Sequence, residues 1–148
     1  MQSRDKKEAV NGILFNDQKT EVLLIKRRDI PVWVLPGGGI EPNESPEKAL
    51  LREFLEETGY LVKIKRKVAT YLPVNRMTQK THFFECEVIE GSAITGNETK
   101  EIQCFSLKKL PKELAPPYKG WILDAMLTTP SRSIKKSKGS LIGCLYTY

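Results

Sequence analysis

Residues 38–60 read GGIEPNESPEKALLREFLEETGY, and this stretch contains the start, body and end of a helix. Ser45 is a good N-cap and Pro46 suits the first helical position. Gly59 can adopt the left-handed conformation that ends a helix. We therefore predict a helix from Pro46 to about Thr58. Its apolar stripe consists of Ala49, Leu50 and Phe54, with Leu51 and Leu55 at the margin.

The opposite side of this helix is acidic. Glu53, Glu56 and Glu57 stand at positions i, i+3 and i+4, so their carboxylates share one face. Like charges repel, and Arg52 is the only cation in that turn. Hard divalent cations neutralise such clusters with oxygen ligands, and Mg2+ does so while keeping water and phosphate oxygens. Three glutamates alone also fit a solvated acidic face, so the wider context has to decide.

That context is the spacing of the whole stretch. From Gly38 onward it follows the pattern G-x5-E-x7-R-E-U-x-E-E-x-G-U, where U is apolar, and it resembles the Nudix (MutT-like) hydrolase family. Every fixed residue of the pattern is present in this sequence. The one difference is Tyr60, which stands at an apolar position where an aliphatic residue is more usual. The approach from Trp33 to Gly38 is also similar. The resemblance implies an α/β (α+β) Nudix fold, a mixed β-sheet sandwiched between α-helices.

The resemblance also implies roles for individual residues. Glu53, Glu56 and Glu57 would ligate Mg2+ or Mn2+ together with the carbonyl of Gly37. Arg52 and Glu44 would orient these ligands. A metal-activated water would then attack a phosphorus of the substrate. These are the residues of a divalent-metal-dependent Nudix pyrophosphohydrolase, an enzyme.

The attacking water also needs a general base. In the family this role falls to a glutamate of the motif, here Glu53, or to one in a later loop. Glu98 and Glu101 precede a predicted strand at Ile102, and Glu98 is the first choice. Candidate substrate-binding residues are Arg27, Arg28, Arg76, Gly38 and Gly39. His82, the only histidine, is assigned no role because a lone histidine on a strand is more often structural.

Other segments complete the expected architecture. Two apolar runs flank Asn16-Asp17-Gln18 and predict a β-hairpin, while Gly37–Gly39 predicts a loop with unusual backbone geometry. The hairpin runs are Ala9–Phe15 and Glu21–Lys26, the further strands are Val32–Leu35, Leu61–Tyr71, Thr81–Ile89 and Ile102–Leu107, and the last helix is Tyr118–Leu127.

Length and composition limit the domain organisation. The 148 residues fit one domain, which we place at residues 1–130, followed by a basic tail at 131–148 that we expect to be flexible.

The net charge of +6 attracts anions such as phosphates, but it also suits nucleic acid or a membrane surface. The basic runs are explained by solvated faces. Three cysteines without C-x-x-C spacing indicate neither zinc nor disulfides. Because the N-terminus lacks an apolar run, we expect a cytoplasmic protein.

The substrate is less well defined by the sequence. Pro73 lies thirteen residues past Tyr60, close to a position seen in ADP-ribose hydrolases, and Gly39 replaces a lysine common in enzymes for oxidised purine triphosphates. We favour a nucleoside diphosphate linked to another moiety, of the nucleotide sugar or ADP-ribose type. Diadenosine polyphosphates and nucleoside triphosphates are the alternatives, and a non-catalytic module that binds nucleotide or RNA is the alternative of another class. A monomer or homodimer is expected.

Overall fold

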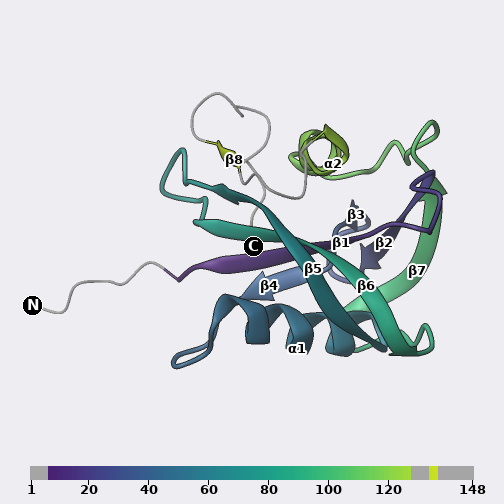
Figure 1. Ribbon diagram of the computed structural model, residues 1–148, viewed down its shortest axis with the longest axis horizontal. Coiled ribbons are helices and arrows are strands. Elements are labelled where there is room, and N and C mark those ends of the chain that lie inside the picture. Colours follow the sequence, from purple (N-terminus) through teal and green to yellow (C-terminus); the bar gives the residue numbers. More distant parts are fainter. Residues whose placement is uncertain (1–6, 128–133, 137–148) are drawn as a thin grey trace, which may run out of the picture.

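The computed structural model describes residues 7–127 and 134–136, and they form two β-sheets and two helices (Figure 1). One sheet has the strand order β4-β1-β6-β5-β8 and the other β3-β2-β7. The strands are β1 (Ala9–Leu14), β2 (Glu21–Arg27), β3 (Trp33–Val34), β4 (Gly37–Gly39), β5 (Tyr60–Tyr71), β6 (Thr81–Gly91), β7 (Thr99–Ser106) and β8 (Ile134–Lys136), and the helices are α1 (Pro46–Thr58) and α2 (Tyr118–Leu127).

The two helices lie on opposite sides of the larger sheet (Figure 1). Strand β1 is parallel to β6 and antiparallel to β4, so this sheet is mixed. The predicted α/β Nudix fold, a mixed sheet between helices, is confirmed. No helix in the described part of the chain is long and apolar enough to cross a membrane.

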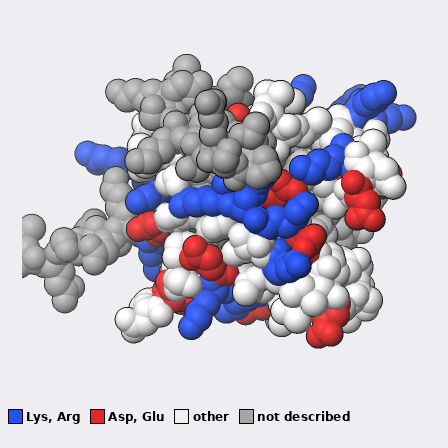
Figure 2. All heavy atoms as spheres, in the orientation of Figure 1, with Lys and Arg blue, Asp and Glu red and all other residues white. Residues whose placement is uncertain are grey.

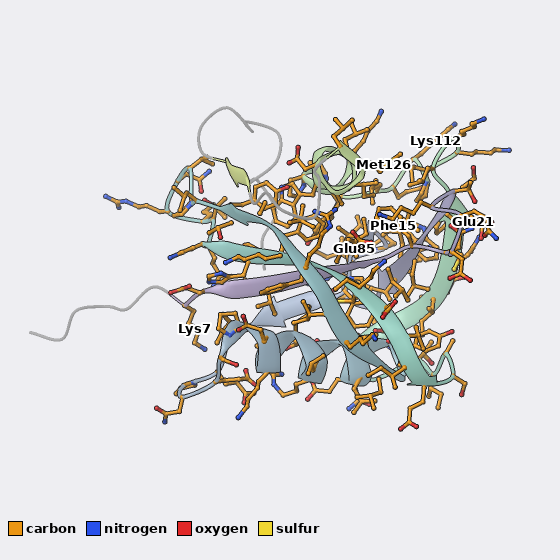
Figure 3. All side chains as sticks on the ribbon, in the orientation of Figure 1. Lys7, Phe15, Glu21, Glu85, Lys112 and Met126 are labelled. Carbon is orange, nitrogen blue, oxygen red and sulfur yellow. The ribbon has the colours of Figure 1, made fainter. Side chains whose placement is uncertain are left out.

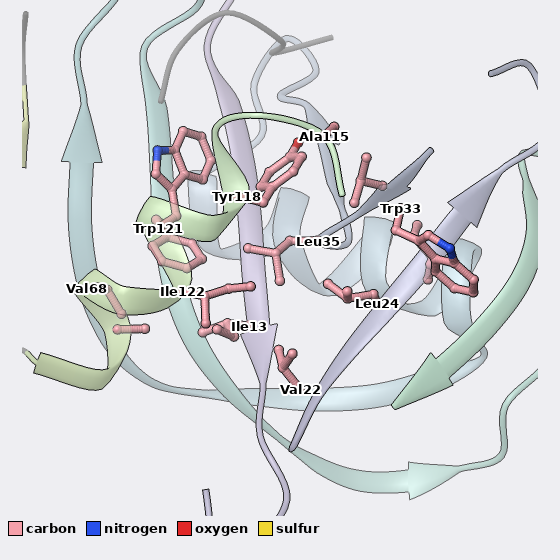
Figure 4. Close-up of a cluster of buried hydrophobic side chains, with 14 of the residues drawn as sticks. Ile13, Val22, Leu24, Trp33, Leu35, Val68, Ala115, Tyr118, Trp121 and Ile122 are labelled. Carbon is pink, nitrogen blue, oxygen red and sulfur yellow. The ribbon is translucent and has the colours of Figure 1, made fainter. Parts of the chain in front are cut away.

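Alternation along β1 divides the core between the two helices. Val10 and Leu14 pack with Leu50 and Phe54 of α1 in one buried cluster. Ile13 points the other way, into a second cluster that contains the α2 side chains (Figure 4). Successive side chains of a strand face opposite sides of the sheet, so one strand supports both layers. In the second cluster, Tyr71 stacks on Trp121 with ring centroids 4.2 Å apart.

Helix α1 has the bounds predicted from its capping residues. The Ser45 side chain accepts a hydrogen bond from the Lys48 amide at 3.2 Å, and Gly59 ends the helix at φ 80°. Ala49, Leu50 and Phe54 are fully buried. Of the two marginal residues, Leu51 is half-buried and Leu55 is 51% exposed. The buried stripe holds the helix against the sheet, which leaves its acidic face free for chemistry.

Removing the N-cap should weaken this helix without touching its acidic face. Ser45→Ala deletes the acceptor for the Lys48 amide, and such a loss costs about 1 kcal/mol of unfolding free energy. Urea denaturation followed by circular dichroism measures this change. Ser45→Asp, which retains an acceptor oxygen, should unfold like the wild type. Equal unfolding free energies for the alanine variant and the wild type would show that the cap contributes nothing.

The predicted hairpin is wrong. Strands β1 and β2 belong to different sheets and are joined only by an isolated bridge between Phe15 and Val22. Strand β6 pairs along the whole of β1 on one edge, and β4 pairs with Ala9–Asn11 on the other, so contact with β2 is limited to the far end. Strand β2 pairs instead with β3 and β7. Apolar runs around a turn predict strands, but they do not reveal competing partners elsewhere in the chain.

The triple glycine also differs from the prediction. Gly37–Gly39 is an extended strand paired with β1, and none of its residues has a φ in the left-handed range. Gly37 is explained by close packing, because a Cβ there would lie 2.1 Å from the Val10 carbonyl oxygen. The expected flexible tail at 131–148 lies outside the described residues, apart from the backbone of β8, which pairs with β5. The domain limits of 1–130 and 131–148 therefore stay a prediction.

A band of Lys and Arg side chains crosses the face of the molecule that Figure 2 shows, beside several carboxylates. On β5, Lys63 pairs with Glu87 at 2.8 Å, and Arg66 pairs with Glu85 at 2.9 Å. Glu85, labelled in Figure 3, also lies 3.3 Å from Lys19. The basic run of β5 is thus offset by carboxylates of β6, which accounts for it without a polyanionic ligand.

Candidate active site

The acidic face of α1 lies beside a cavity of about 490 Å³. Five parts of the chain build its wall: the end of β2, strand β3, strand β4, helix α1 and the segment before β7. The lining residues are Arg27, Arg28, Asp29, Val34, Gly37, Gly38, Gly39, Glu53, Glu57, Asn97 and Glu98. A second hollow of about 520 Å³ shares Glu53, Glu57, Asn97 and Glu98 and adds Glu56 and Gly96. Basic groups therefore face acidic groups across one space.

Arg52 holds the acidic cluster in place. Its guanidinium donates to both carboxylate oxygens of Glu44, at 2.8 and 2.9 Å, and to Glu53 Oε1 at 2.8 Å. It also donates to the carbonyl oxygen of Gly39 at 3.1 Å. The Arg52 guanidinium lowers the pKa of Glu44 to about 2. A planar guanidinium can satisfy several acceptors with fixed geometry, so Arg52 ties the start of α1, its acidic face and β4 together.

Glu57 is held by a backbone amide of β4. Its Oε1 accepts a hydrogen bond from the Gly37 amide at 2.8 Å, which links α1 directly to β4. Burial raises the pKa of Glu57 well above its usual value, despite that hydrogen bond, and Glu53 and Glu98 add repulsion. Burial also raises the pKa of Glu53, although Arg52 opposes this effect. Of these two desolvated carboxylates, only Glu53 contacts Arg52, so the site favours further positive charge.

Glycines in β4 allow this close approach. A Cβ added to Gly38 would lie 2.7 Å from the carboxylate of Glu53, so any side chain there would displace that glutamate. Gly39 is different, because a Cβ added there would meet nothing within 4 Å. The packing of Gly38 therefore sets how near the strand comes to the acidic face, and Gly39 leaves open space in the cavity wall.

A family profile described as NUDIX domain matches residues 5–125. The chain belongs to the Nudix family. A Bacillus subtilis protein provisionally named an 8-oxo-dGTP diphosphatase is 35% identical over 113 residues, covering 76% of this chain and 75% of that protein. An ADP-ribose pyrophosphatase of Methanocaldococcus jannaschii is 39% identical over 111 residues, covering 70% of this chain and 64% of that protein. This Nudix protein is thus a pyrophosphohydrolase, as predicted.

The solved structures agree with the fold of this Nudix enzyme. The crystal structure of an ADP-ribose pyrophosphatase from Streptococcus suis superposes with a TM-score of 0.70 at 23% identity, covering 89% of this chain and 98% of that one. A Nudix hydrolase from Nitrosomonas europaea gives a TM-score of 0.77 at 24% identity, covering 93% and 82% of the two chains. Both comparisons show the fold of the whole described domain.

Nudix enzymes typically use divalent metals, and the donor set of this site fits one. Glu53, Glu56 and Glu57 supply hard carboxylate oxygens on one helix face. In the described part of the chain, however, no group of three acidic, histidine or cysteine side chains converges on a single point. Glu53 is turned to Arg52, Glu57 to the Gly37 amide, and Glu56 is 59% exposed. The assignment of these three residues and of the Gly37 carbonyl as ligands stays a prediction.

The other predicted site residues divide into two groups. Glu98 and Arg27 line the cavity, and Arg27 forms an ion pair with Asp29. Glu101 instead lies on β7, 3.7 Å from Lys26, and lines neither hollow. Arg76 is exposed between β5 and β6 and also lines neither hollow. The structure therefore favours Glu98 over Glu101 as a loop acid and does not bring Arg76 to the site.

His82 lies outside both hollows and has bonded partners on either side. Its Nε2 is 2.6 Å from Glu8 Oε1, and its Nδ1 is 2.8 Å from Lys67 Nζ. Four lining residues were not predicted as site residues: Asp29, Val34, Gly96 and Asn97. No motif marks them. They reach the site because the end of β2, strand β3 and the segment before β7 come together beside α1, and local sequence does not encode that arrangement.

Proposed function

We propose that this enzyme hydrolyses the phosphoanhydride bond of a nucleoside diphosphate linked to a sugar or similar group, with Mg2+ or Mn2+ as cofactor. One observation carries the proposal: the arginines at the end of β2 and the carboxylates of α1 line the same cavity. A diphosphate with a bound cation presents negative oxygens to Arg27 and positive charge to Glu53 and Glu57. The name of the Methanocaldococcus jannaschii relative, an ADP-ribose pyrophosphatase, supports this substrate class.

Each residue at the site has a defined part in the proposed reaction. Glu53, Glu56, Glu57 and the Gly37 carbonyl would hold the cation, which when bound activates water and neutralises phosphate charge. Arg52, through Glu44 and Glu53, keeps the ligand face oriented. Gly38 and Gly39 let the phosphates approach the backbone of β4 closely.

Glu98 is the proposed general base. It lines the same cavity as Glu53 and Glu57, and it is close enough to both for its charge to raise their pKa values. No basic side chain forms an ion pair with Glu98 within the described residues. A carboxylate placed this way can accept the proton of an attacking water. Arg27 would orient the phosphate chain from the opposite wall.

A purine nucleoside triphosphate is the second candidate substrate. It is supported by the name of the Bacillus subtilis relative, a provisional 8-oxo-dGTP diphosphatase, at 35% identity. Such a substrate would place its triphosphate in the same cavity and would use the same carboxylates. The two candidates differ in what is attached to the second phosphate, which is either a sugar or a third phosphate.

A substrate panel tests the proposed function. Purified enzyme is assayed with ADP-ribose, GDP-mannose, UDP-glucose, diadenosine tetraphosphate, dGTP and 8-oxo-dGTP, each with Mg2+, Mn2+ or EDTA. We expect turnover that requires the metal and a kcat/KM highest for a nucleoside diphosphate sugar, with a nucleoside monophosphate among the products. A preference for 8-oxo-dGTP would select the second candidate. Absence of metal-dependent turnover on the whole panel would contradict both.

A further inference from the structure

The segment that carries Glu98 is packed directly against the backbone of α1. Gly96 lies so close to this helix that an added Cβ would be 2.3 Å from the carbonyl oxygen of Glu56. The neighbouring Ile94 amide donates to the carbonyl oxygen of Thr58 at 2.9 Å. Both carbonyl groups belong to the last turn of α1, so the segment packs on the same turn that carries Glu56 and Glu57.

The other side of the segment is attached to β2. The Arg28 amide donates to the carbonyl oxygen of Glu98 at 3.1 Å, and Arg28 Nε donates to that of Gly96 at 3.4 Å. The Thr99 amide also donates to Gly96 O at 3.4 Å, and the Thr99 side chain is fully buried. Glu98 thus lies between two anchors, one on α1 and one on β2.

We infer that Gly96 is a positioning residue, whose missing side chain sets the distance between Glu98 and the carboxylates of α1. A Cβ at this position meets a backbone atom of a helix, which cannot rotate away as a side chain can. The segment itself must then move outward, and it carries Glu98 two residues later. A base that moves away from its water loses efficiency steeply. This inference rests on the proposed function, in which Glu98 accepts the proton of the attacking water.

The first test is Gly96→Ala. We expect kcat to fall between tenfold and about a hundredfold, the loss that a displacement near 1 Å produces. The KM for the nucleotide and the Mn2+ affinity, measured by electron paramagnetic resonance without substrate, should stay within about twofold because the α1 carboxylates remain in place. Gly120→Ala is the matched control, since a Cβ there meets nothing within 4 Å, and its kcat should equal that of the wild type.

A double-mutant cycle with Glu98→Gln distinguishes a displacement of Glu98 from a general loss of structure at the site. Glu98→Gln alone should lower kcat by about 10² to 10⁴, as expected for a lost base. If Gly96 acts through Glu98, adding Gly96→Ala to Glu98→Gln should lower kcat no further.

Several results would overturn the inference. Losses that multiply in the double variant, a Mn2+ affinity that falls with kcat, or full kcat in Gly96→Ala would each show that Gly96 does not act through Glu98. Full turnover by Glu98→Gln would also overturn it, although metal-dependent hydrolysis by the wild type would still support the proposed function. Failure of the wild type on the whole substrate panel would remove the proposed function and this inference together.

Discussion

Glu57→Gln should lower metal-dependent kcat by at least about a thousandfold, because a bound cation contributes several kcal/mol to the stabilisation of the transition state. Glutamine has nearly the shape of glutamate and can still accept a hydrogen bond from the Gly37 amide. The substitution therefore removes the charge that is proposed to bind the cation, while keeping the contact between α1 and β4. Steady-state kinetics with Mg2+ and Mn2+ measure the loss. Activity near the wild-type level would exclude Glu57 from the metal site.

The pH dependence of stability provides a separate measurement for the same variant. In the metal-free protein, burial raises the pKa of Glu57 above its unfolded value. The folded state then binds this proton more tightly, so the stabilisation is present at low pH and is lost as pH rises through the raised pKa. The wild type should lose thermal stability from pH 5 to pH 8, and Glu57→Gln should lose less. A larger loss in the variant would contradict the assigned sign.

Arg52→Ala has the second large expected effect. It removes the hydrogen-bond donor that lies 2.8 Å from both Glu44 and Glu53 and leaves these two carboxylates without that partner. Mn2+ affinity should fall about 10- to 100-fold, as for other groups that orient metal ligands. Unfolding free energy should fall by about 2 kcal/mol, the contribution of hydrogen bonds to charged groups. Electron paramagnetic resonance titration measures the Mn2+ affinity, and urea denaturation measures the unfolding free energy.

Two further variants control this experiment. Lys48→Ala removes one positive charge from an exposed position of the same helix, so it should change neither Mn2+ affinity nor stability beyond a few tenths of a kcal/mol. Arg52→Lys keeps the charge but cannot bridge both oxygens of Glu44, and it should recover only part of the loss. In Arg52→Ala, the pKa of Glu44 should rise from about 2 toward 4.5, which carboxyl NMR can follow. An unchanged pKa would show that Arg52 does not control that carboxyl.

The sequence predicted the bounds of α1 and the position of its acidic face well because both are local. Ser45, Pro46 and Gly59 determine where the helix starts and stops, and each acts on residues within one turn. The spacing of Glu53, Glu56 and Glu57 places them together on any helix, whatever surrounds it. The contact of Arg52 with Glu44 also spans only eight residues. The helix bounds, the shared carboxylate face and the Arg52–Glu44 contact therefore all depend on residues that are close together in the sequence.

Pairing between distant segments was predicted less well. The runs of β1 and β2 were correctly recognised as strands, but their hairpin pairing was wrong because β1 pairs with β6 and β4, while β2 pairs with β3 and β7. The glycines of β4 were expected to permit unusual backbone angles, whereas Gly37 and Gly38 allow close approach of β1 and of the Glu53 carboxylate. In both cases a partner far away in the chain decides the outcome.

The amino-acid sequence alone determined the family, the helix that carries the carboxylates and the residues on its acidic face, because each depends on spacing within residues 38–60. The tertiary structure alone decided which loop acid and which arginines face those carboxylates. Glu98 and Glu101 are only three residues apart, yet only Glu98 lines the cavity. The reason is steric: the segment before β7 can rest on the last turn of α1 only where Gly96 has no side chain, and that contact exists only in the folded chain.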